Sequence, residues 1–493
     1  MDICMLNKKQ KLLLTALSII YFLAVIFVAY DVRGTDQFWY LDEFSNFVKT
    51  GTFYSNFLYP YFLCNFGISD LQPPIHNCYL QALFFFPAFV VLGVKHGFFV
   101  MNALCCIISA YIAFKIVLKW NRNTNYALFA FFLVLFLPTT FFYSLNMLME
   151  IFLMFCVGVS SYLWILYFEK KSLAYGLSAF FVALFFVLIY PIFIAQSLFI
   201  LIHIIWENRK KRFSYYLAAL FLFIPLMMVV EKIFMPSLAG ILRLTGILSI
   251  NQHIDYANMI QFFSLEEFGS LSDWILYRIW RLSKSLSSLP ALATMAVGVF
   301  LYATSFIFAV KRRGIALFCF FLQSSIILPL FVIFFAHQYQ FRYSIIYMII
   351  MLPTFFWLLE KLPRFFSMGG VLFLSALFFI FVDIAIAKSL INDISNEREY
   401  KRLIYEYAPT DTKVLDAIYL GGDKTLCVHS HIHEIDFTKL GLDLRGKYII
   451  TRYEVDGNRL NGIKVGIPIK ILETKSCLNG RGALTKIYIY RID

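Results

Sequence analysis

Apolar runs that recur from residue 12 to residue 388 constrain the fold of this chain more than any other feature. A helix needs about 20 predominantly apolar residues to cross a bilayer, and most of the runs approach that length. With 60% of its 493 residues hydrophobic and only 15% charged, the chain fits a polytopic α-helical membrane protein and not a soluble globule. The runs lie at 12–30, 79–93, 97–118, 125–143, 151–168, 173–189, 191–206, 215–234, 289–310, 314–336, 343–359 and 368–388.

Short clusters of Lys and Arg separate these runs. The positive-inside rule places such clusters in the cytoplasm, where they orient the helices. The net charge of +13 gathers largely in these clusters, so it does not indicate nucleic-acid binding. The clusters are Lys8 to Lys11, Lys115 with Lys119 and Arg122, Lys170 with Lys171, Arg209 to Arg212, Lys311 to Arg313, and Lys361 with Arg364.

The run at 79–93 decides the topology. If it does not cross the membrane, every basic cluster falls on the cytoplasmic side; if it crosses, all but the first fall outside. We therefore expect about eleven spans, a cytoplasmic N-terminus, and an outer loop at 31–96. The paired prolines Pro73 and Pro74 favour a fresh helix start, so we interpret 73–93 as a surface or re-entrant helix in that loop.

An acid-rich segment, Thr35 to Gly51 (TDQFWYLDEFSNFVKTG), follows the first apolar run directly. Its pattern is that of an amphipathic helix, and we expect this helix to lie on the membrane surface with Asp36 at its start. The expected apolar face contains Tyr40 or Leu41, Phe44, and Phe47 or Val48. The expected solvated face contains Asp42, Glu43, Ser45, Asn46 and Lys49.

The last hundred residues differ in composition from the rest. Charge and glycine content rise, and short alternating segments at 413–415, 447–450 and 486–490 predict strands after a helix near 397–407. We expect a membrane domain at 1–388 and a small soluble α/β domain on the outer side at 389–493.

The nine cysteines divide by environment. Four fall outside the membrane, where an oxidising compartment favours the pairs Cys64–Cys78 and Cys427–Cys477; four unpaired thiols are the alternative. The other five are expected to be free thiols in the tail or the spans, where they behave as small hydrophobes. These five are Cys4, Cys105, Cys106, Cys156 and Cys319.

The order of the motifs resembles that of the GT-C class of membrane glycosyltransferases. The run from Asp36 to Gly51 is similar to the first outer loop of that class, and QPPIHNCYLQALFFFPAFVVLG to the Pro-Pro helix of the branch with protein O-mannosyltransferases and lipid A aminoarabinose transferases. In SLNMLMEIFLMF, Glu150 stands at the place of the second acid. The likeness continues at Gln340 to Tyr343 and in the soluble terminal domain, so it covers nearly the whole chain.

This resemblance implies an inverting glycosyltransferase that takes one sugar from a polyprenyl-phosphate donor on the outer face. Asp36 is the candidate base for the acceptor hydroxyl, with a helix N-cap as the alternative. Arg342 is the candidate for the donor phosphate, helped by His337 and Gln340, with an interface anchor as the alternative.

Further candidates are assigned around these groups. Glu150 is expected to hold a divalent metal ion or to orient the acceptor, or else simply to begin a span. Candidate contacts to the acceptor or metal are His76, Asp42 and Glu43. For His76 a structural interfacial role is the alternative, and for the two acids the solvated face is the simpler interpretation.

The sequence favours a bacterial inner-membrane enzyme whose acceptor is O-antigen, another envelope glycan or lipid A. No glycine-rich phosphate loop follows a strand, which fits a lipid-linked donor rather than a nucleotide sugar. One alternative is a polymerase or ligase of lipid-linked glycans, for which Arg278 and Arg281 are the only support. Another is a flippase or transporter without chemistry, which would need polar groups at mid-bilayer.

Overall fold

The fold is described from a computed structural model. It describes residues 7–29, 35–51, 79–186, 193, 196–207, 276, 307, 342–360, 370 and 373–388, together with seven strands at 418–420, 426–428, 448–451, 459–460, 463–464, 470–475 and 484–491.

Three described helices are long and apolar enough to cross a membrane: α1 (Lys8–Val28), α5 (Val94–Asn121) and α8 (Glu150–Lys170). A fourth candidate is the pair α6 (Thr124–Phe136) and α7 (Pro138–Ser144), which meet at a bend of 47°. These helices cover four of the predicted runs, as expected of a helical membrane protein.

Shorter apolar helices accompany them. Within the predicted run at 79–93, the described helix α4 (Tyr79–Leu92) is one of the shorter apolar helices; residues 73–78, where the surface helix was predicted to begin, lie outside the described residues. The other short helices are α9 (Leu173–Phe186), a helix at 196–207, α18 (Arg342–Leu359) and a helix at 373–388. The runs at 215–234, 289–310 and 314–336 lie outside the described residues, so the number of spans stays a prediction.

Local chemistry explains where several helices begin. Asn7 opens α1 with a capping box, in which its Oδ1 accepts from the Gln10 N–H at 2.8 Å. Asn123 caps α6 by accepting from the N–H of Asn125 at 2.9 Å. Pro138 begins α7, where its missing N–H costs nothing.

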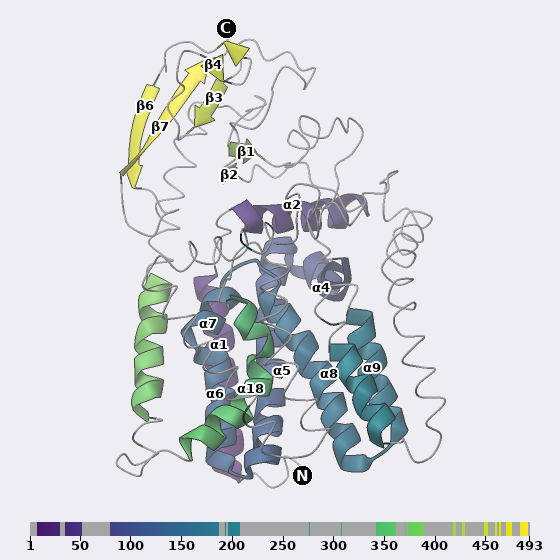
Figure 1. Ribbon diagram of the computed structural model, residues 1–493. Coiled ribbons are helices and arrows are strands. Elements are labelled where there is room, and N and C mark those ends of the chain that lie inside the picture. The colour runs from purple at the N-terminus through teal and green to yellow at the C-terminus, as the bar shows by residue number, and fades with distance from the viewer. Residues whose placement is uncertain are drawn as a thin grey trace.

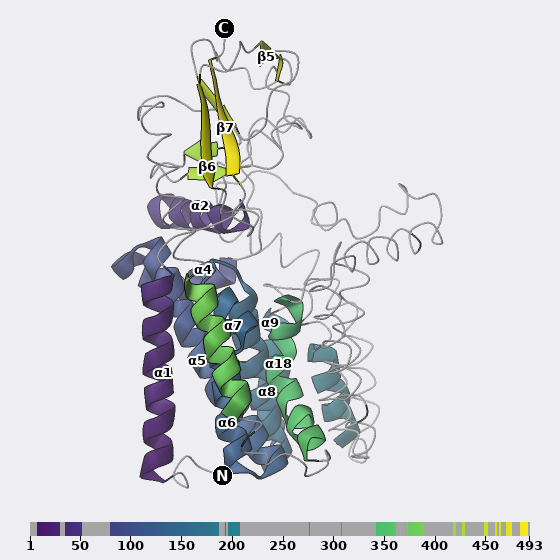
Figure 2. The same ribbon diagram turned by 90° about the vertical axis from the view of Figure 1, so that its left-hand side faces the viewer.

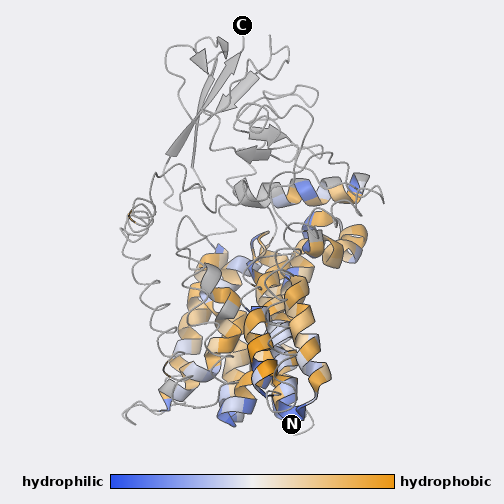
Figure 3. Cartoon of the chain, turned by 45° about the vertical axis from the view of Figure 1, so that its right-hand side comes forward, coloured by the Kyte–Doolittle hydropathy of each residue, from blue (hydrophilic) through white to orange (hydrophobic). Residues whose placement is uncertain are grey.

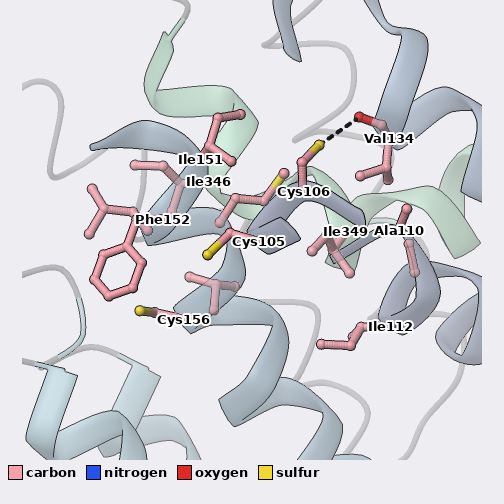
Figure 4. Packing of buried hydrophobic residues seen from close by; sticks show 14 of the residues in the cluster. Cys105, Cys106, Ala110, Ile112, Val134, Ile151, Phe152, Cys156, Ile346 and Ile349 are labelled. Atoms are coloured by element: carbon pink, nitrogen blue, oxygen red, sulfur yellow. Dashed lines mark hydrogen bonds between the residues drawn. The ribbon is translucent and has the colours of Figure 1, made fainter. Parts of the chain in front are cut away.

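The helix break at Pro138 leaves one backbone carbonyl inside the bundle without its usual helical donor. A proline supplies no N–H to the carbonyl four residues before it, which here is Val134. The Cys106 thiol of α5 donates to this carbonyl at a sulfur–oxygen distance of 3.7 Å (Figure 4). Cys105, Cys106 and Cys156 are buried free thiols, which confirms the prediction for these three.

The two ends of the bundle differ in chemistry. The chain begins at one end of the bundle (Figures 1 and 3). At this end ion pairs join neighbouring helices: Lys119 Nζ lies 2.9 Å from Glu169, and Lys171 Nζ lies 3.0 Å from Glu207. The opposite end is covered by α2 (Thr35–Thr50), with α4 beneath it and the strands beyond (Figures 1 and 2). The basic clusters carried by α1, α5 and α8 therefore share one end, as the topology predicts.

Helix α5 is the centre of the packing, because it contacts α1, α2, α4, α6, α7, α8 and α18. Its closest approach is to α4. A Cβ built on Gly97 would lie 2.7 Å from both the carbonyl carbon and the carbonyl oxygen of Ala88, and 2.9 Å from the amide nitrogen of Phe89. Only glycine allows the two backbones to come this close.

The described residues of the C-terminal part form strands. Strands β3 (Tyr448–Thr451), β7 (Leu484–Arg491) and β6 (Lys470–Lys475) form an antiparallel sheet in the order β3-β7-β6. Strand β1 (Ile418–Leu420) pairs with β2 (Leu426–Val428), and β4 (Arg459–Leu460) with β5 (Ile463–Lys464), both antiparallel. Two predicted strands, at 447–450 and 486–490, are confirmed; the segment at 413–415 and the helix near 397–407 lie outside the described residues.

Replacing Gly97 with alanine tests the close packing of α4 on α5. The added methyl meets backbone atoms, which cannot rotate away, so we expect a loss of about 1–3 kcal/mol of stability. Gly158→Ala is the matched control, because the nearest atoms to its Cβ would be side-chain atoms: the Cδ1 atoms of Ile349 and Ile112, at 3.2 and 3.3 Å. Thermal unfolding of both variants in detergent measures the difference. Equal loss in the two variants would contradict the packing described for α4.

Candidate functional site

Helix α2 is held on the end of the bundle by aromatic contacts. The Phe44 ring stacks on Phe98 of α5 with 5.9 Å between ring centroids, and lies 5.3 Å from Phe89 of α4. Tyr40, Phe44 and Phe47 are all buried, which confirms the predicted apolar face. The helix closes at Gly51, whose N–H donates to the Phe47 carbonyl at 2.9 Å and whose φ is +72°. Asp36 lies in its first turn, as predicted.

Glu43 corrects the prediction for the other face of α2. It was expected on a solvated face, but its side chain is fully buried, whereas Lys49 is exposed. The reason is that α2 is covered from both sides: it packs on α4 and α5 below and contacts β2 above. The side chain of Asp42 lies outside the described residues. A carboxyl group is therefore enclosed at the outer end of the bundle.

Beneath α2, phenylalanine rings from four helices form one cluster, which we call the aromatic layer: Phe44, Phe85, Phe89, Phe98 and Phe152. Phe85 of α4 contacts Phe98 of α5 and Phe152 of α8, both with ring centroids 5.4 Å apart in edge-on geometry. Such pairs add about 0.5–1.5 kcal/mol each to the area they bury. The layer fixes the starts of α4, α5 and α8 relative to α2.

Buried amides sit beside the aromatic layer. Gln81 lies one turn before Phe85 on α4 and is fully buried, and neither of its amide atoms has a hydrogen-bond partner among the described residues. Asn102 lies one turn after Phe98 on α5. Its Nδ2 donates to the Asn146 carbonyl at 3.4 Å, while its Oδ1 has no partner in the described part of the chain. Sequence reasoning missed both. The only signal available was a single amide inside an apolar run.

Glu150 is the first residue of α8 and is 4% exposed. It was predicted near the start of a span, and this position is confirmed. The positive end of a helix dipole stabilises a carboxylate there. Two residues further on, Phe152 joins the aromatic layer, so Glu150 lies at the same end of the bundle as α2.

Helix α18 runs from this end towards the basic end. Its lower half is tied to the end of α5, because the Asn121 side-chain amide donates to the Pro353 carbonyl at 3.1 Å. Near that level the Phe356 ring stacks on Tyr126, with centroids 5.0 Å apart. Helix α18 therefore begins at the α2 end of the bundle, and Arg342 is its first residue.

Helices α8 and α18 lie side by side and run in the same direction. Gly158 of α8 faces Ile349 of α18, whose Cδ1 would stand 3.2 Å from an added Cβ. Glu150 comes eight residues before Gly158 and Arg342 seven before Ile349, which is about 12 Å and about 10.5 Å of helix. The two helix starts are thus at nearly the same height. Figure 4 shows the packed residues just inside them, Ile151 and Ile346.

The structure thus gathers three predicted groups at one end of the bundle: the start of α2 with Asp36, the start of α8 with Glu150, and the start of α18 with Arg342. Cys427 lies in β2, and the side chains of Asp36 and Arg342 are not described. The remaining predicted residues lie outside the described residues: His76, His337, Gln340, Cys64, Cys78 and Cys477.

Within the described residues there is no group of three or more His, Cys, Asp or Glu side chains able to hold a metal ion. The divalent ion assigned to Glu150 therefore stays a prediction, and no chemical step below depends on it. In comparisons with known proteins, the chain matches no family model and no curated protein.

Phe44→Ala tests whether the aromatic layer holds α2 in place. Removing a fully buried ring that contacts two other helices is expected to cost about 3 kcal/mol or more. Lys49→Ala is the control on the same helix, because Lys49 is exposed and its replacement is expected to change stability little. The measurement is thermal unfolding in detergent. Similar melting temperatures for the two variants would show that α2 is not anchored by these rings.

Proposed function

We propose that the protein is an integral-membrane, inverting glycosyltransferase that moves one sugar from a polyprenyl-phosphate carrier to an acceptor on the outer face of the membrane. One observation carries the proposal: α2, α8 and α18 begin at the same end of the bundle, opposite the basic end. Their first turns contain Asp36, Glu150 and Arg342. Placing these three residues at one end of the bundle supports the proposal, because such a transfer needs a base, a phosphate-binding group and a group that orients the acceptor close together.

The proposed chemistry follows from the residue types. A sugar hydroxyl is a weak acid, so a carboxylate that takes its proton as the new bond forms lowers the barrier; this role is assigned to Asp36. The departing polyprenyl phosphate gains negative charge, which the guanidinium of Arg342 stabilises through two parallel donors. Glu150 orients the acceptor. A single displacement of this kind inverts the anomeric centre.

The finer architecture belongs to the same proposal. Residues 1–388 form the membrane domain with about eleven spans, and 389–493 form an α/β domain on the outer side. The basic end faces the cytoplasm, in accordance with the positive-inside rule, and the membrane is the bacterial inner membrane. Its acceptor is O-antigen, another envelope glycan or lipid A.

Asp36→Asn is the central test. With membranes that contain the full-length protein and a panel of radiolabelled polyprenyl-phosphate sugars, we expect sugar transfer to fall about 100-fold or more, since the amide cannot accept the proton. Retained transfer by the Asp36→Asn variant would contradict the role of Asp36. A transporter would move its substrate much as before, so loss of transfer also separates the two classes.

Glu150→Gln has a matched control on the same helix. Glu169 lies at the opposite, basic end of α8, where it pairs with Lys119. We expect Glu150→Gln to lower transfer and Glu169→Gln to leave it nearly unchanged, because only Glu150 stands at the outer end. Equal loss in both variants would indicate a general effect on folding and not a role in transfer.

Arg342→Lys tests the group assigned to the donor phosphate. It is expected to weaken donor binding by about tenfold, since lysine lacks the paired donors.

A further inference from the structure

Asp383 lies on the helix at 373–388, away from the aromatic layer. Most of this helix faces outwards with large apolar side chains, such as Phe373, Phe378 and Phe381, which are 62%, 62% and 71% exposed. Asp383 is 5% exposed and is the only buried residue of the helix. The one carboxyl group of this helix therefore points into the bundle.

Among the residues that the structure describes, neither carboxyl oxygen of Asp383 has a hydrogen-bond partner, and no Lys, Arg or His pairs with it. An isolated ionised carboxylate shut off from water costs several kcal/mol even after the surroundings relax. An unpartnered carboxyl within a membrane helix is therefore kept for a purpose or kept neutral. The polar groups around Asp383 indicate whether its carboxyl group is charged or neutral.

Tyr21 of α1, which is fully buried, lies close enough to interact electrostatically with Asp383, although no hydrogen bond joins the two side chains. The protons in its hydrogen-bond chain have a fixed direction. The Ser144 hydroxyl donates to the Thr140 carbonyl at 2.9 Å, and a carbonyl can only accept. The Tyr21 hydroxyl therefore donates its own proton to Ser144.

The direction of these hydrogen bonds bears on the charge of Asp383. With its proton committed to Ser144, the Tyr21 oxygen can only accept a further hydrogen bond. The lone pairs of this oxygen would repel the negative charge of an ionised carboxylate nearby. A protonated carboxyl avoids this repulsion. The other titratable group beside Tyr21 is the Cys106 thiol of α5, which donates to the Val134 carbonyl.

We propose that Asp383 is a proton-binding site within the membrane: a buried, protonated carboxyl group beside the hydrogen-bonded chain Tyr21, Ser144 and Thr140. The site lies between the helix at 373–388, α1 and α7. It is independent of the proposed sugar transfer. Protonation of Asp383 favours the packing of the helix at 373–388 with this side chain inside the bundle. Loss of the proton would leave an unpaired negative charge buried there.

A hydrophobic carbodiimide tests the site directly, since such reagents partition into membranes and react with protonated carboxyl groups. The carboxyl O–H adds across one C=N bond: a C–O bond forms, the π bond breaks, and the proton moves to nitrogen. The acyl group then migrates from oxygen to nitrogen, which leaves a stable N-acylurea. Nothing is oxidised or reduced, and no group departs.

The experiment uses the full chain in membranes with radiolabelled dicyclohexylcarbodiimide, followed by mass spectrometry of the peptide that contains residue 383. We expect labelling of the wild type at neutral pH, a fall in labelling as the pH is raised through the alkaline range, and background labelling in Asp383→Asn. Tyr21→Phe is expected to remain labelled, because the carboxyl stays buried and neutral. Absence of label on Asp383 at neutral pH would overturn the proposal.

Stability provides a second readout that does not depend on reagent access. The Asp383→Asn variant carries a neutral side chain of the same shape as the protonated carboxyl, so we expect its melting temperature at neutral pH to equal that of the wild type. On raising the pH, the wild type is expected to lose stability relative to Asp383→Asn, because only Asp383 can ionise. A variant clearly less stable than the wild type at neutral pH would show that the charge is used, and the proposal would be wrong.

Discussion

The contact of Phe44 with Phe98 and Phe89 is the interaction on which the outer end of the molecule depends. It holds an amphipathic helix flat against the ends of α4 and α5, and the rings of Phe85 and Phe152 extend the same cluster to α8. Without it, α2 would be free to leave the bundle. The position of Asp36 relative to α8 and α18 would then no longer be fixed.

The sequence predicted the parts of this structure that depend on composition and periodicity. The apolar face of α2 followed from the spacing of Tyr40, Phe44 and Phe47, and the apolar helices α1, α5 and α8 from the length of the apolar runs. The burial of Glu43 could not be predicted in this way, because periodicity describes one helix against one partner. It does not reveal that a second layer covers the opposite face of the helix.

The candidate site shows the same division. The starts of α2, α8 and α18 were predicted to lie on one side of the membrane, since topology alone decides that. Their relative height depends on the contact of Gly158 with Ile349, a pairing between residues far apart in the chain. The burial of the amides Gln81 and Asn102 was not predicted either. The sequence of an apolar run does not show whether a single polar side chain in it points towards a neighbouring helix or away from the bundle.

The thiol–carbonyl contact between Cys106 and Val134 has a practical consequence for anyone who wishes to remove the native cysteines before attaching spectroscopic probes. Serine at this position retains a donor for the carbonyl that Pro138 leaves without a helical N–H. Alanine or valine at residue 106 would leave the Val134 carbonyl oxygen without a hydrogen-bond donor in an apolar interior, where no water can replace it. The Cys156 thiol makes no hydrogen bond within the described part of the chain, so Cys156 is the safer cysteine to replace first.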